Sequence, residues 1–285
     1  MKIPKGLQPL VDDGIVDQVI RQLQSGKEAA VYIVVCGDEV RCAKVYKAAE
    51  NRSFHTATDY REGRKVRGSR DTRATGKRSR HGRKVQEAEW KSAEVDALYV
   101  LADAGVRVPT PLGMHDGVLL MELVLDAHGN PAPQIGAVEI TAQEALEWHA
   151  FMIDQIVRML CAGLIHGDLS EYNVLLGPLG PVIIDLPQAT NASGNNNAFR
   201  LLDRDIANMR SLFARAAPEL MATQYAREIW DLYEAGDLHP ETVLTGLYVR
   251  REANADVDAI LDQIQEARLE AEARQLGREE AEQYD

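Results

Sequence analysis

The pattern of apolar and polar positions divides the chain into a sheet-rich first part and a helix-rich second part. Apolar residues from Val11 to Leu23 recur at helical spacing, which predicts a helix within an N-terminal helical extension spanning residues 1–24. The stretch AAVYIVVCGDEVRCAKVY then holds two β-rich runs around Gly37 and Asp38, a pattern typical of a hairpin. The N-terminal part is therefore predicted to be mainly antiparallel sheet.

Helical patterns dominate the rest of the chain. The stretch QEAEWKSAEVDALYVLADAG has helical periodicity and ends at Gly105, whereas GVLLMELVL has the pattern of a buried strand. Thr141 and Glu144 have the spacing of a capping box, which predicts a long helix from Thr141 through about Ala162. YNVLL and PVIID predict two short strands, and helices follow. The predicted fold class is α+β.

Composition limits the kinds of protein this chain can be. With 285 residues, 45% of them hydrophobic, it is long enough for two modest lobes or one large domain. No stretch approaches the roughly 20 apolar residues of a membrane span. The three cysteines lack C-x-x-C spacing and a nearby histidine cluster, so neither a disulfide framework nor a zinc site is predicted. We expect a cytoplasmic protein with no membrane contact.

Charge is distributed unevenly along the sequence. Residues 52–84 contain twelve Lys or Arg against three Asp or Glu, whereas residues 252–285 contain eleven acidic residues against three basic ones. Because the basic run has few aliphatic residues, we predict a flexible loop. Two interpretations remain open: a solvated charged loop, or a docking surface for ribosomal RNA, ribonucleoprotein or an acidic protein. The acidic tail, residues 251–285, is predicted to be an exposed helix.

The segment LIHGDLSEYNVLL places a polar octet between apolar flanks. Phosphoryl transfer needs metal, a cation on the other phosphates and a carboxylate at the acceptor hydroxyl. Asp168 would orient or deprotonate the acceptor, and Asn173, five positions later, would offer its amide oxygen to Mg²⁺. Asp185, which ends PVIID, would supply a carboxylate oxygen to the same metal. The loop that carries Asp168 and Asn173 would thus both position the acceptor hydroxyl and bind the metal.

Other parts of the same chemistry lie upstream. Strand alternation puts Ala43 and Val45 on one face and Lys44 on the other, where Lys44 would point into a cleft and pair with Glu94. Gly26 lies at a turn where backbone N–H groups could approach phosphate. Each residue alone would more often be a surface charge or an ordinary turn. Together with H-x-D-x-x-x-x-N and I-I-D, in this order, they match the kinase signature.

Three further residues near these motifs have less certain roles. His166 is interpreted as structural, bracing the loop from behind, because Asp168 already supplies the carboxylate. Asp203 and Asp205, in LLDRDIANM, remain open between a role in the cleft and a helix-surface or structural ion-pair role.

At these motifs the chain resembles the RIO kinases, atypical serine/threonine protein kinases. The resemblance rests on SGKEAAVY, WKSAE, HGDLSEYNVLL and IIDLPQA, and it covers roughly residues 25–212. It implies a two-lobed protein-kinase-like domain at residues 25–250, with a mainly antiparallel N-lobe at about 25–120 and a mainly helical C-lobe at about 125–250. It also implies ATP and Mg²⁺ as cofactors, with Mn²⁺ as an alternative metal.

The family pattern assigns residues to the nucleotide site. The residues that it implies are Ser25, Gly26, Lys27 and Glu28 in the phosphate loop, Val31 among the nucleotide contacts, Lys44 at the α/β-phosphates, Met121 as gatekeeper, and backbone groups of Glu122 and Val124 as the hinge. The implied catalytic set is Lys44, Glu94, Asp168, Asn173 and Asp185, of which Asn173 and Asp185 hold the metal.

The chain also departs from an ordinary protein kinase. Gly167 replaces the arginine of H-R-D, Asp185 is followed by Leu-Pro instead of Phe-Gly, and neither A-P-E nor a long activation segment is present. Too few residues precede Ser25 for a winged-helix domain, which favours a first-subfamily or bacterial-type member. Because the peptide platform is missing, we expect autophosphorylation on flexible segments. The candidate acceptors are Ser53, Thr56, Ser69, Thr72 and Ser79.

Three functions remain open at this point. The first is an ATP- and Mg²⁺-dependent serine/threonine protein kinase that acts on a protein substrate or on itself. The second is a small-molecule phosphotransferase of the aminoglycoside- or choline-kinase type, because those enzymes share H-G-D-x-x-x-x-N. The third, suggested by the resemblance, is an ATPase in ribosome-related assembly.

Overall fold

The computed structural model describes most of the chain from residue 3 to residue 248. The described ranges are 3–26, 29–47 and 94–248. The predicted basic loop at 52–84 and acidic tail at 251–285 lie outside the described residues. Met1–Leu247 form one compact unit, and the second unit, Tyr248–Asp285, is described only at Tyr248.

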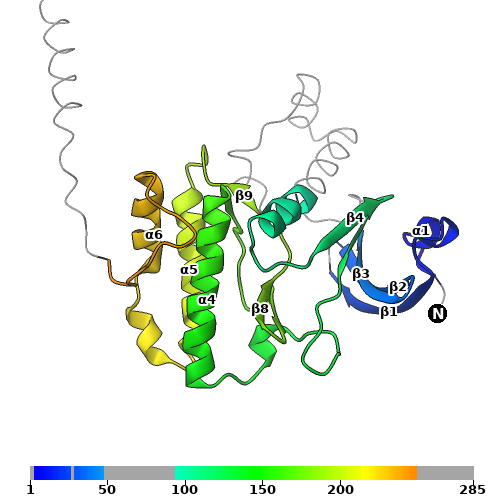
Figure 1. Ribbon diagram of the computed structural model, residues 1–285, viewed down its shortest axis with the longest axis horizontal. Coiled ribbons are helices and arrows are strands. Elements are labelled where there is room, and N and C mark those ends of the chain that lie inside the picture. Colours follow the sequence, from blue (N-terminus) through cyan, green and yellow to red (C-terminus); the bar gives the residue numbers. More distant parts are fainter. Residues whose placement is uncertain (1–2, 27–28, 48–93, 249–285) are drawn as a thin grey trace, which may run out of the picture. The chain divides into compact units, whose positions relative to one another are not determined.

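A five-stranded antiparallel sheet forms the N-terminal part, with strand order β1-β2-β3-β5-β4 (Figure 1). Its elements are α1 (Gln8–Asp12), β1 (Gln18–Ser25), β2 (Ala29–Cys36), β3 (Glu39–Tyr46), β4 (Pro111–His115) and β5 (Val118–Glu122). β2 and β3 are the predicted hairpin, and Gly37 at its turn has φ +60°, a left-handed conformation that favours glycine. The predicted buried strand is β5, whose first three residues are buried. Both predictions are confirmed.

The predicted helix from Val11 to Leu23 is wrong beyond its first residues. After the end of α1 at Asp12 the chain turns, and residues 18–23 belong to β1, which pairs with β2 and contains two register shifts. Because each bulge displaces the alternation, the half-buried side chains of β1 are Val19 and Leu23, four positions apart. A bulged strand therefore has the apolar spacing of a helix, and the sheet begins inside the predicted helical extension 1–24.

The two faces of the sheet pack against different partners. Ala43 is fully buried with residues around α1, and Val45 packs against the same cluster. Leu119, which lies directly opposite Lys44 in the pairing of β3 with β5, belongs instead to the core that contains the C-terminal helices. The predicted separation of Lys44 from Ala43 and Val45 is confirmed, and Lys44 lies on the face toward the C-terminal region.

Helices dominate the C-terminal part, as predicted. Its elements are η2 (Ile135–Ala137), α4 (Ala142–Cys161), β6 (Leu164–Ile165), β7 (Val174–Gly177), β8 (Gly180–Ile183), β9 (Thr190–Asn191), α5 (Ala198–Phe213), η3 (Pro218–Ala222) and α6 (Tyr225–Glu234). Thr141 and Glu144 form the predicted capping box before α4. β7 and β8 are the two predicted short strands, and they pair with each other. Residues 94–103 are helical, and Gly105 follows this helix with φ +73°.

In the part of the chain that the structure describes, no helix combines the length and the hydrophobicity needed to cross a membrane. The cysteines Cys36, Cys42 and Cys161 are all free thiols. The large core is built mainly from α4, α5 and α6 together with the helix at 94–103. This core fixes the loops between α4 and α5 that carry the polar motifs.

Candidate active site

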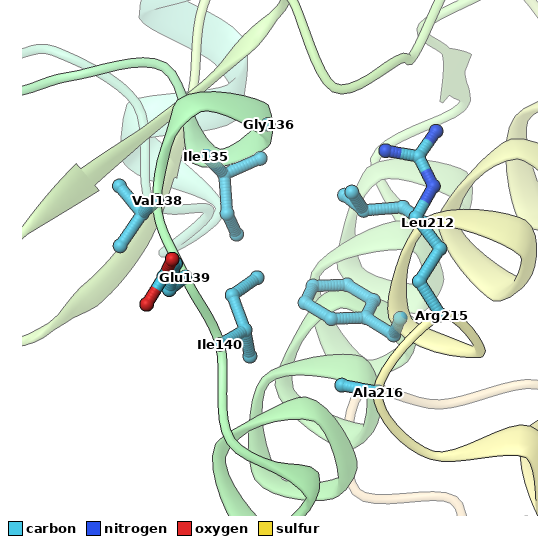
Figure 2. A pocket seen from close by; sticks show the side chains of 9 residues that line it. Ile135, Gly136, Val138, Glu139, Ile140, Leu212, Arg215 and Ala216 are labelled. Atoms are coloured by element: carbon cyan, nitrogen blue, oxygen red, sulfur yellow. The ribbon is translucent and has the colours of Figure 1, made fainter.

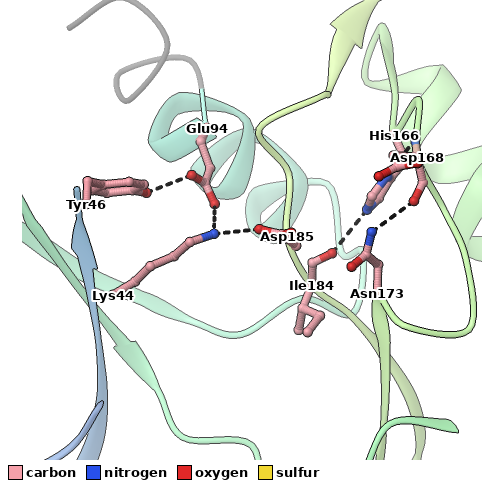
Figure 3. A network of polar contacts seen from close by, with 8 residues as sticks. All are labelled: Lys44, Tyr46, Glu94, His166, Asp168, Asn173, Ile184 and Asp185. Carbon is pink, nitrogen blue, oxygen red and sulfur yellow. Dashed lines mark hydrogen bonds and ion pairs between the residues drawn. The ribbon is translucent and has the colours of Figure 1, made fainter. Parts of the chain in front are cut away.

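Lys44 lies at the centre of a partly buried ionic cluster (Figure 3). Its Nζ is 2.5 Å from Glu94 Oε1 and 2.6 Å from Asp185 Oδ1. Lys44 comes from β3, Glu94 from the helix at 94–103, and Asp185 from the segment after β8. The predicted ion pair between Lys44 and Glu94 is therefore present, and Asp185 is a second partner that the sequence analysis did not assign to Lys44.

The charges of this cluster stabilise one another. Burial lowers the pKa of Lys44, but the neighbouring Glu94 and Asp185 carboxylates outweigh burial and raise that pKa above its ordinary value. Lys44 is therefore a cation at neutral pH. Glu94 is 4% exposed, whereas the Asp185 side chain is 44% exposed. The buried carboxylate is suited to hold the lysine, and the exposed one remains accessible to a ligand.

Tyr46 completes the contacts of Glu94. Its hydroxyl donates a hydrogen bond of 2.8 Å to Glu94 Oε2, the oxygen that does not contact Lys44. Tyr46 follows Lys44 by two positions on β3, so both side chains lie on the same face of the sheet. Tyr46 was not among the predicted site residues, although strand alternation places it beside Lys44. With both oxygens held, the Glu94 carboxylate has one orientation toward the lysine.

Replacing Tyr46 with phenylalanine is expected to lower kcat/KM for ATP about tenfold, because it removes one hydrogen bond to a buried carboxylate while keeping the ring. Steady-state kinetics of phosphate transfer measures the effect. Tyr32→Phe is the matched control, since Tyr32 is buried against α1 on the other face of the sheet. Equal losses in both variants would show that Tyr46 does not orient Glu94.

His166 braces the loop that carries Asp168, as predicted. The imidazole is 2% exposed; Nδ1 accepts a hydrogen bond of 3.2 Å from the Asp168 N–H, and Nε2 lies 3.1 Å from the Ile184 carbonyl oxygen. These two contacts require the neutral tautomer with its proton on Nε2. His166 thus links the Asp168 loop to the residue before Asp185, and its interpretation as structural is confirmed.

Asp168 and Asn173 face each other across the same loop (Figure 3). Asn173 Nδ2 donates a hydrogen bond of 2.9 Å to the Asp168 carbonyl oxygen, which leaves the Asn173 amide oxygen as the atom able to bind a cation. Burial raises the pKa of the Asp168 carboxyl, with a further contribution from Asp185, while Arg204 opposes the rise. Asp168 is therefore a stronger base than an exposed aspartate.

The backbone of Asp185 is in an uncommon conformation. Its φ is +65°, in the left-handed region that non-glycine residues seldom occupy and that aspartate tolerates better than most. Such conformations persist only where the surroundings hold them, and they concentrate at functional sites. Here the Ile184 carbonyl bond to His166 and the ion pair with Lys44 fix the residue on both sides. The side chain is directed at Lys44 as a result.

Asp205, on α5, anchors the catalytic loop. Its two carboxylate oxygens accept hydrogen bonds from the backbone N–H groups of Gly167 (2.7 Å) and Leu169 (3.0 Å), the residues on either side of Asp168. Asn208 Nδ2 donates to the Leu169 carbonyl oxygen at 2.8 Å, and Arg204 donates to the Gly167 carbonyl oxygen. Asp205 therefore has the structural role that sequence reasoning left open, and it positions Asp168.

We expect Asp205 to make stability depend on pH between about 4 and 6. Burial raises the pKa of Asp205 from 3.8 to about 6, and the hydrogen bonds from Gly167 and Leu169 oppose the rise. The folded protein therefore binds more protons than the unfolded chain in this window. Proton binding by Asp205 therefore makes its full contribution to the free energy of unfolding below pH 4. This contribution declines by roughly 3 kcal/mol as the pH rises to 6.

Urea unfolding of the wild type and of Asp205→Asn between pH 4 and 7 measures this contribution. The amide does not titrate, so the stability of the wild type relative to the variant should fall as the pH rises through the window. Parallel pH profiles for the two proteins would show that the Asp205 carboxyl titrates normally.

The residues expected to contact nucleotide lie on the Lys44 face of the sheet or beside it. Val31 lies directly opposite Lys44 in the pairing of β2 with β3, so the two side chains share a face. Met121 packs against the same large core as Leu119. Glu122 N–H bonds to the Thr110 carbonyl oxygen and the Val124 carbonyl oxygen to Ala132 N–H. The expected gatekeeper and hinge are thus at the end of β5.

Ser25 and Gly26, the described residues of the expected phosphate loop, lie at and directly after the end of β1. Gly26 N–H bonds to the Ala29 carbonyl oxygen at 2.9 Å, and Ser25 is exposed next to it. Lys47 Nζ donates to Ser25 Oγ (3.0 Å) and to the Gly26 carbonyl oxygen (2.5 Å), a contact that the sequence analysis did not predict. Lys27 and Glu28 lie outside the described residues.

The chemistry of two side chains fits a magnesium ion. Asn173 offers an amide oxygen and Asp185 a half-exposed carboxylate, the hard oxygen ligands that Mg²⁺ prefers together with water and phosphate. Within the described ranges no group of three or more His, Cys, Asp or Glu side chains could hold a metal by itself. The protein ligands are thus suited to a cation that arrives with a phosphorylated ligand.

A lysine on a sheet that pairs with a helix glutamate, beside a loop with Asp168 and Asn173, defines the protein-kinase-like class of phosphotransferase. The profile of the RIO domain matches residues 30–226, most of the chain. The chain belongs to the RIO kinase family, so the resemblance seen in the sequence is confirmed, and with it the assignment as a RIO-type serine/threonine protein kinase.

Individual relatives agree with the family. Over 211 residues the chain is 34% identical to the RIO-type serine/threonine-protein kinase Rio1 of Haloferax volcanii, covering 72% of this chain and 67% of that protein. Over 220 residues it is 30% identical to the human serine/threonine-protein kinase RIO1, covering 74% of this chain. The match spans only 36% of the human relative, about a third of its length.

The fold agrees with solved structures. The crystal structure of the Rio2 kinase-ADP/Mg²⁺-phosphoaspartate complex from Chaetomium thermophilum matches with a TM-score of 0.53 at 23% sequence identity, covering 74% of this chain and 59% of that chain. A second crystal structure of the same kinase matches with a TM-score of 0.51. The predicted two-lobed fold, an N-terminal antiparallel sheet followed by a helical C-terminal region, is confirmed.

Proposed function

We propose that this protein transfers the γ-phosphoryl group of ATP to a serine or threonine hydroxyl, with Mg²⁺ as the metal and Mn²⁺ as an alternative. The observation that carries the proposal is the ionic cluster of Lys44, Glu94 and Asp185 beside the loop that holds Asp168 and Asn173. Membership in the RIO kinase family supports the same reaction.

Each residue has a defined part in the proposed reaction. Lys44, oriented by Glu94, neutralises charge on the α/β-phosphates. The Asp168 carboxylate accepts the proton of the acceptor hydroxyl as the new oxygen–phosphorus bond forms and the bond to the ADP oxygen breaks. The raised pKa of Asp168 favours this proton transfer. Asn173 and Asp185 would hold Mg²⁺, which neutralises phosphate charge when bound.

The adenine is proposed to lie against the end of β5. Met121 would border the base as gatekeeper, and the Glu122 carbonyl and Val124 N–H groups would form the hinge contacts. Val31 shares the Lys44 face of the sheet and would cover the base from β2. Ser25, Gly26, Lys27 and Glu28 would approach the phosphates. The common face of Val31 and Lys44 supports this arrangement.

The acceptor is proposed to be the protein itself as well as a protein substrate. Only twelve residues separate Asp185 from the first residue of α5, too few for the peptide platform of ordinary kinases. Serine and threonine hydroxyls of the protein's own chain are therefore the easiest acceptors to bring to Asp168. A competing acceptor is the Asp185 carboxylate, whose phosphorylation would produce an acyl phosphate; the Rio2 crystal structure named above contains a phosphoaspartate.

Labelling with γ-phosphate-labelled ATP tests the proposed function. Serine or threonine phosphate survives hydroxylamine, whereas an acyl phosphate on Asp185 is cleaved by it. We expect hydroxylamine-resistant label on the protein, with the sites found by peptide mapping. If no protein-bound phosphate forms while an amino sugar or a small alcohol is phosphorylated efficiently, the protein is instead a small-molecule phosphotransferase.

A role as an ATPase in ribosome-related assembly is proposed on the charge of residues 52–84, with twelve basic residues against three acidic ones. Such a segment favours binding to ribosomal RNA or ribonucleoprotein. Co-sedimentation with ribosomal particles should differ between ATP and ADP and should weaken as salt is raised. Equal co-sedimentation with both nucleotides would exclude a nucleotide-dependent assembly role.

A further inference from the structure

Residues 131–134 form an extended segment that starts beside the expected hinge. The segment begins Pro-Ala-Pro, and proline favours extended backbone because it fixes its own φ and disfavours the helical conformation in the residue before it. Ala132 N–H donates a hydrogen bond of 2.9 Å to the Val124 carbonyl oxygen, and Pro131 forms an isolated β-bridge with Leu125. The start of the segment is therefore fixed next to Val124, a residue expected to contact adenine.

The end of this segment is fixed to β7. Leu176 N–H donates a hydrogen bond of 2.9 Å to the Pro133 carbonyl oxygen, and Gln134 forms an isolated β-bridge with Leu175. Since β7 begins at the residue after Asn173, the segment runs beside the residues that directly follow this expected metal ligand. The segment thus connects the expected hinge with the catalytic loop.

The side chain of Gln134 reaches the residue before Asn173. Its Nε2 donates a hydrogen bond of 3.0 Å to the Tyr172 carbonyl oxygen. This oxygen belongs to the planar peptide unit that joins Tyr172 to Asn173, so a rotation of that unit would break the bond. On its other side, the Asn173 carbonyl oxygen accepts a hydrogen bond of 2.9 Å from Ile184 N–H. The backbone of Asn173 is therefore held from both sides.

Beyond Gln134 the chain borders a pocket of about 400 Å³ (Figure 2). Residues 135–140 contribute one wall, and the end of α5 with the residues that follow it contributes the other. Atoms that line a pocket have no packing partners on that side, so contacts elsewhere must fix the wall. One such contact is at Gly136, where an added Cβ would lie 3.1 Å from side-chain carbons of Glu171. The bond from Gln134 to Tyr172 is the polar contact between this part of the chain and the catalytic loop.

We propose that Gln134 is a positioning residue, whose bond to the Tyr172 carbonyl oxygen fixes the orientation in which Asn173 offers its amide oxygen to Mg²⁺. The inference rests on the proposed role of Asn173 as a metal ligand and adds the residue that orients it. Gln134 lies outside the kinase signature motifs, and its side-chain amide is directed at backbone, not at a ligand. The bond joins two uncharged groups, so its loss should change affinity by a moderate factor, about fivefold.

Calorimetric titration of the full-length protein with ATP, in the presence and absence of Mg²⁺, tests the proposal. Gln134→Ala should weaken binding about fivefold with Mg²⁺ and less than twofold without it, because the variant leaves Lys44 and the sheet unchanged. The matched control is Gln143→Ala, since Gln143 is an exposed glutamine on α4 that contacts only Glu147 among the printed side-chain bonds of its helix turn. This control should change neither affinity by more than about twofold.

A double-variant cycle separates positioning of Asn173 from a general loss of structure. Asn173→Ala removes the amide oxygen, so adding Gln134→Ala in that background should cause no further loss of Mg²⁺-dependent binding. Hydrogen exchange provides a second measurement that needs no metal. Backbone amides of residues 170–174 should exchange faster in Gln134→Ala than in the wild type, whereas those of α4 should be unchanged.

Several results would overturn the proposal. Equal weakening of ATP binding with and without Mg²⁺ would mean that Gln134 acts on the whole nucleotide site. A loss that persists in the Asn173→Ala background, or no loss in either background, would remove Gln134 from the positioning of Asn173 and leave the proposed function intact. If Mg²⁺ does not strengthen ATP binding by the wild type, or if Asn173→Ala binds ATP and Mg²⁺ as the wild type does, the proposed metal site fails and the inference fails with it.

Discussion

Asp185→Asn is expected to weaken Mg²⁺-dependent binding of ATP at least tenfold, whereas Asp168→Asn is expected to leave binding intact and to lower kcat about 10²- to 10⁴-fold. The two substitutions are isosteric and act on different steps. Asp185 presents a half-exposed carboxylate, suited to the metal, whereas Asp168 shares its loop with Asn173 and would take up the acceptor proton. Calorimetric binding of ATP with and without Mg²⁺, combined with single-turnover transfer, separates the two effects.

The control for this pair is Asp203→Asn, a substitution of the same kind on α5 at an exposed position outside the cluster. It should change neither nucleotide affinity nor turnover by more than about twofold. Equal losses of ATP·Mg affinity in Asp185→Asn and Asp168→Asn would show that the two carboxylates do not divide metal binding and acceptor activation between them.

The parts of the fold that sequence predicted correctly are those whose signals are local. The turn at Gly37 and the capping box of Thr141 and Glu144 lie within a few residues, so their geometry follows from residue type. β1 was misassigned because its bulges are set by pairing with β2, which a single segment does not reveal. The strands β6 and β9 were not predicted, since two residues each are too few to show a period.

The residues of the site also divide into those that local motifs predict and those that only tertiary packing reveals. Lys44, Asp168, Asn173 and Asp185 belong to recognisable motifs in a fixed order, so their proximity could be expected before the structure was seen. Asp205 could not be assigned, because its bonds to the loop join residues 38 and 36 positions apart and depend on how α5 packs. Tertiary packing, not a motif, decides which buried carboxylate positions a catalytic loop.

The pairing of Lys44 with Glu94 leads to the second large effect. Lys44→Ala and Glu94→Ala should each lower kcat/KM about 10²-fold or more, and the double variant should be little worse than either single variant. The reason is that Glu94 is buried and held by Tyr46, so it would act on the nucleotide only through Lys44, the lysine that it contacts. Steady-state kinetics of all four proteins gives the coupling between the two side chains.

The free energies of unfolding should show the same coupling, and the double variant should regain part of the stability that Lys44→Ala loses. Lys44→Ala leaves the Glu94 carboxylate, 4% exposed, without its cation, and loss of one partner of a buried pair costs about 3–5 kcal/mol. Lys44→Ala/Glu94→Ala removes both charges, so the double variant should be more stable than Lys44→Ala alone. Urea unfolding of the four proteins measures this. Additive losses in both kinetics and stability would mean that the two side chains act independently, and Glu94 would then have no part in orienting Lys44.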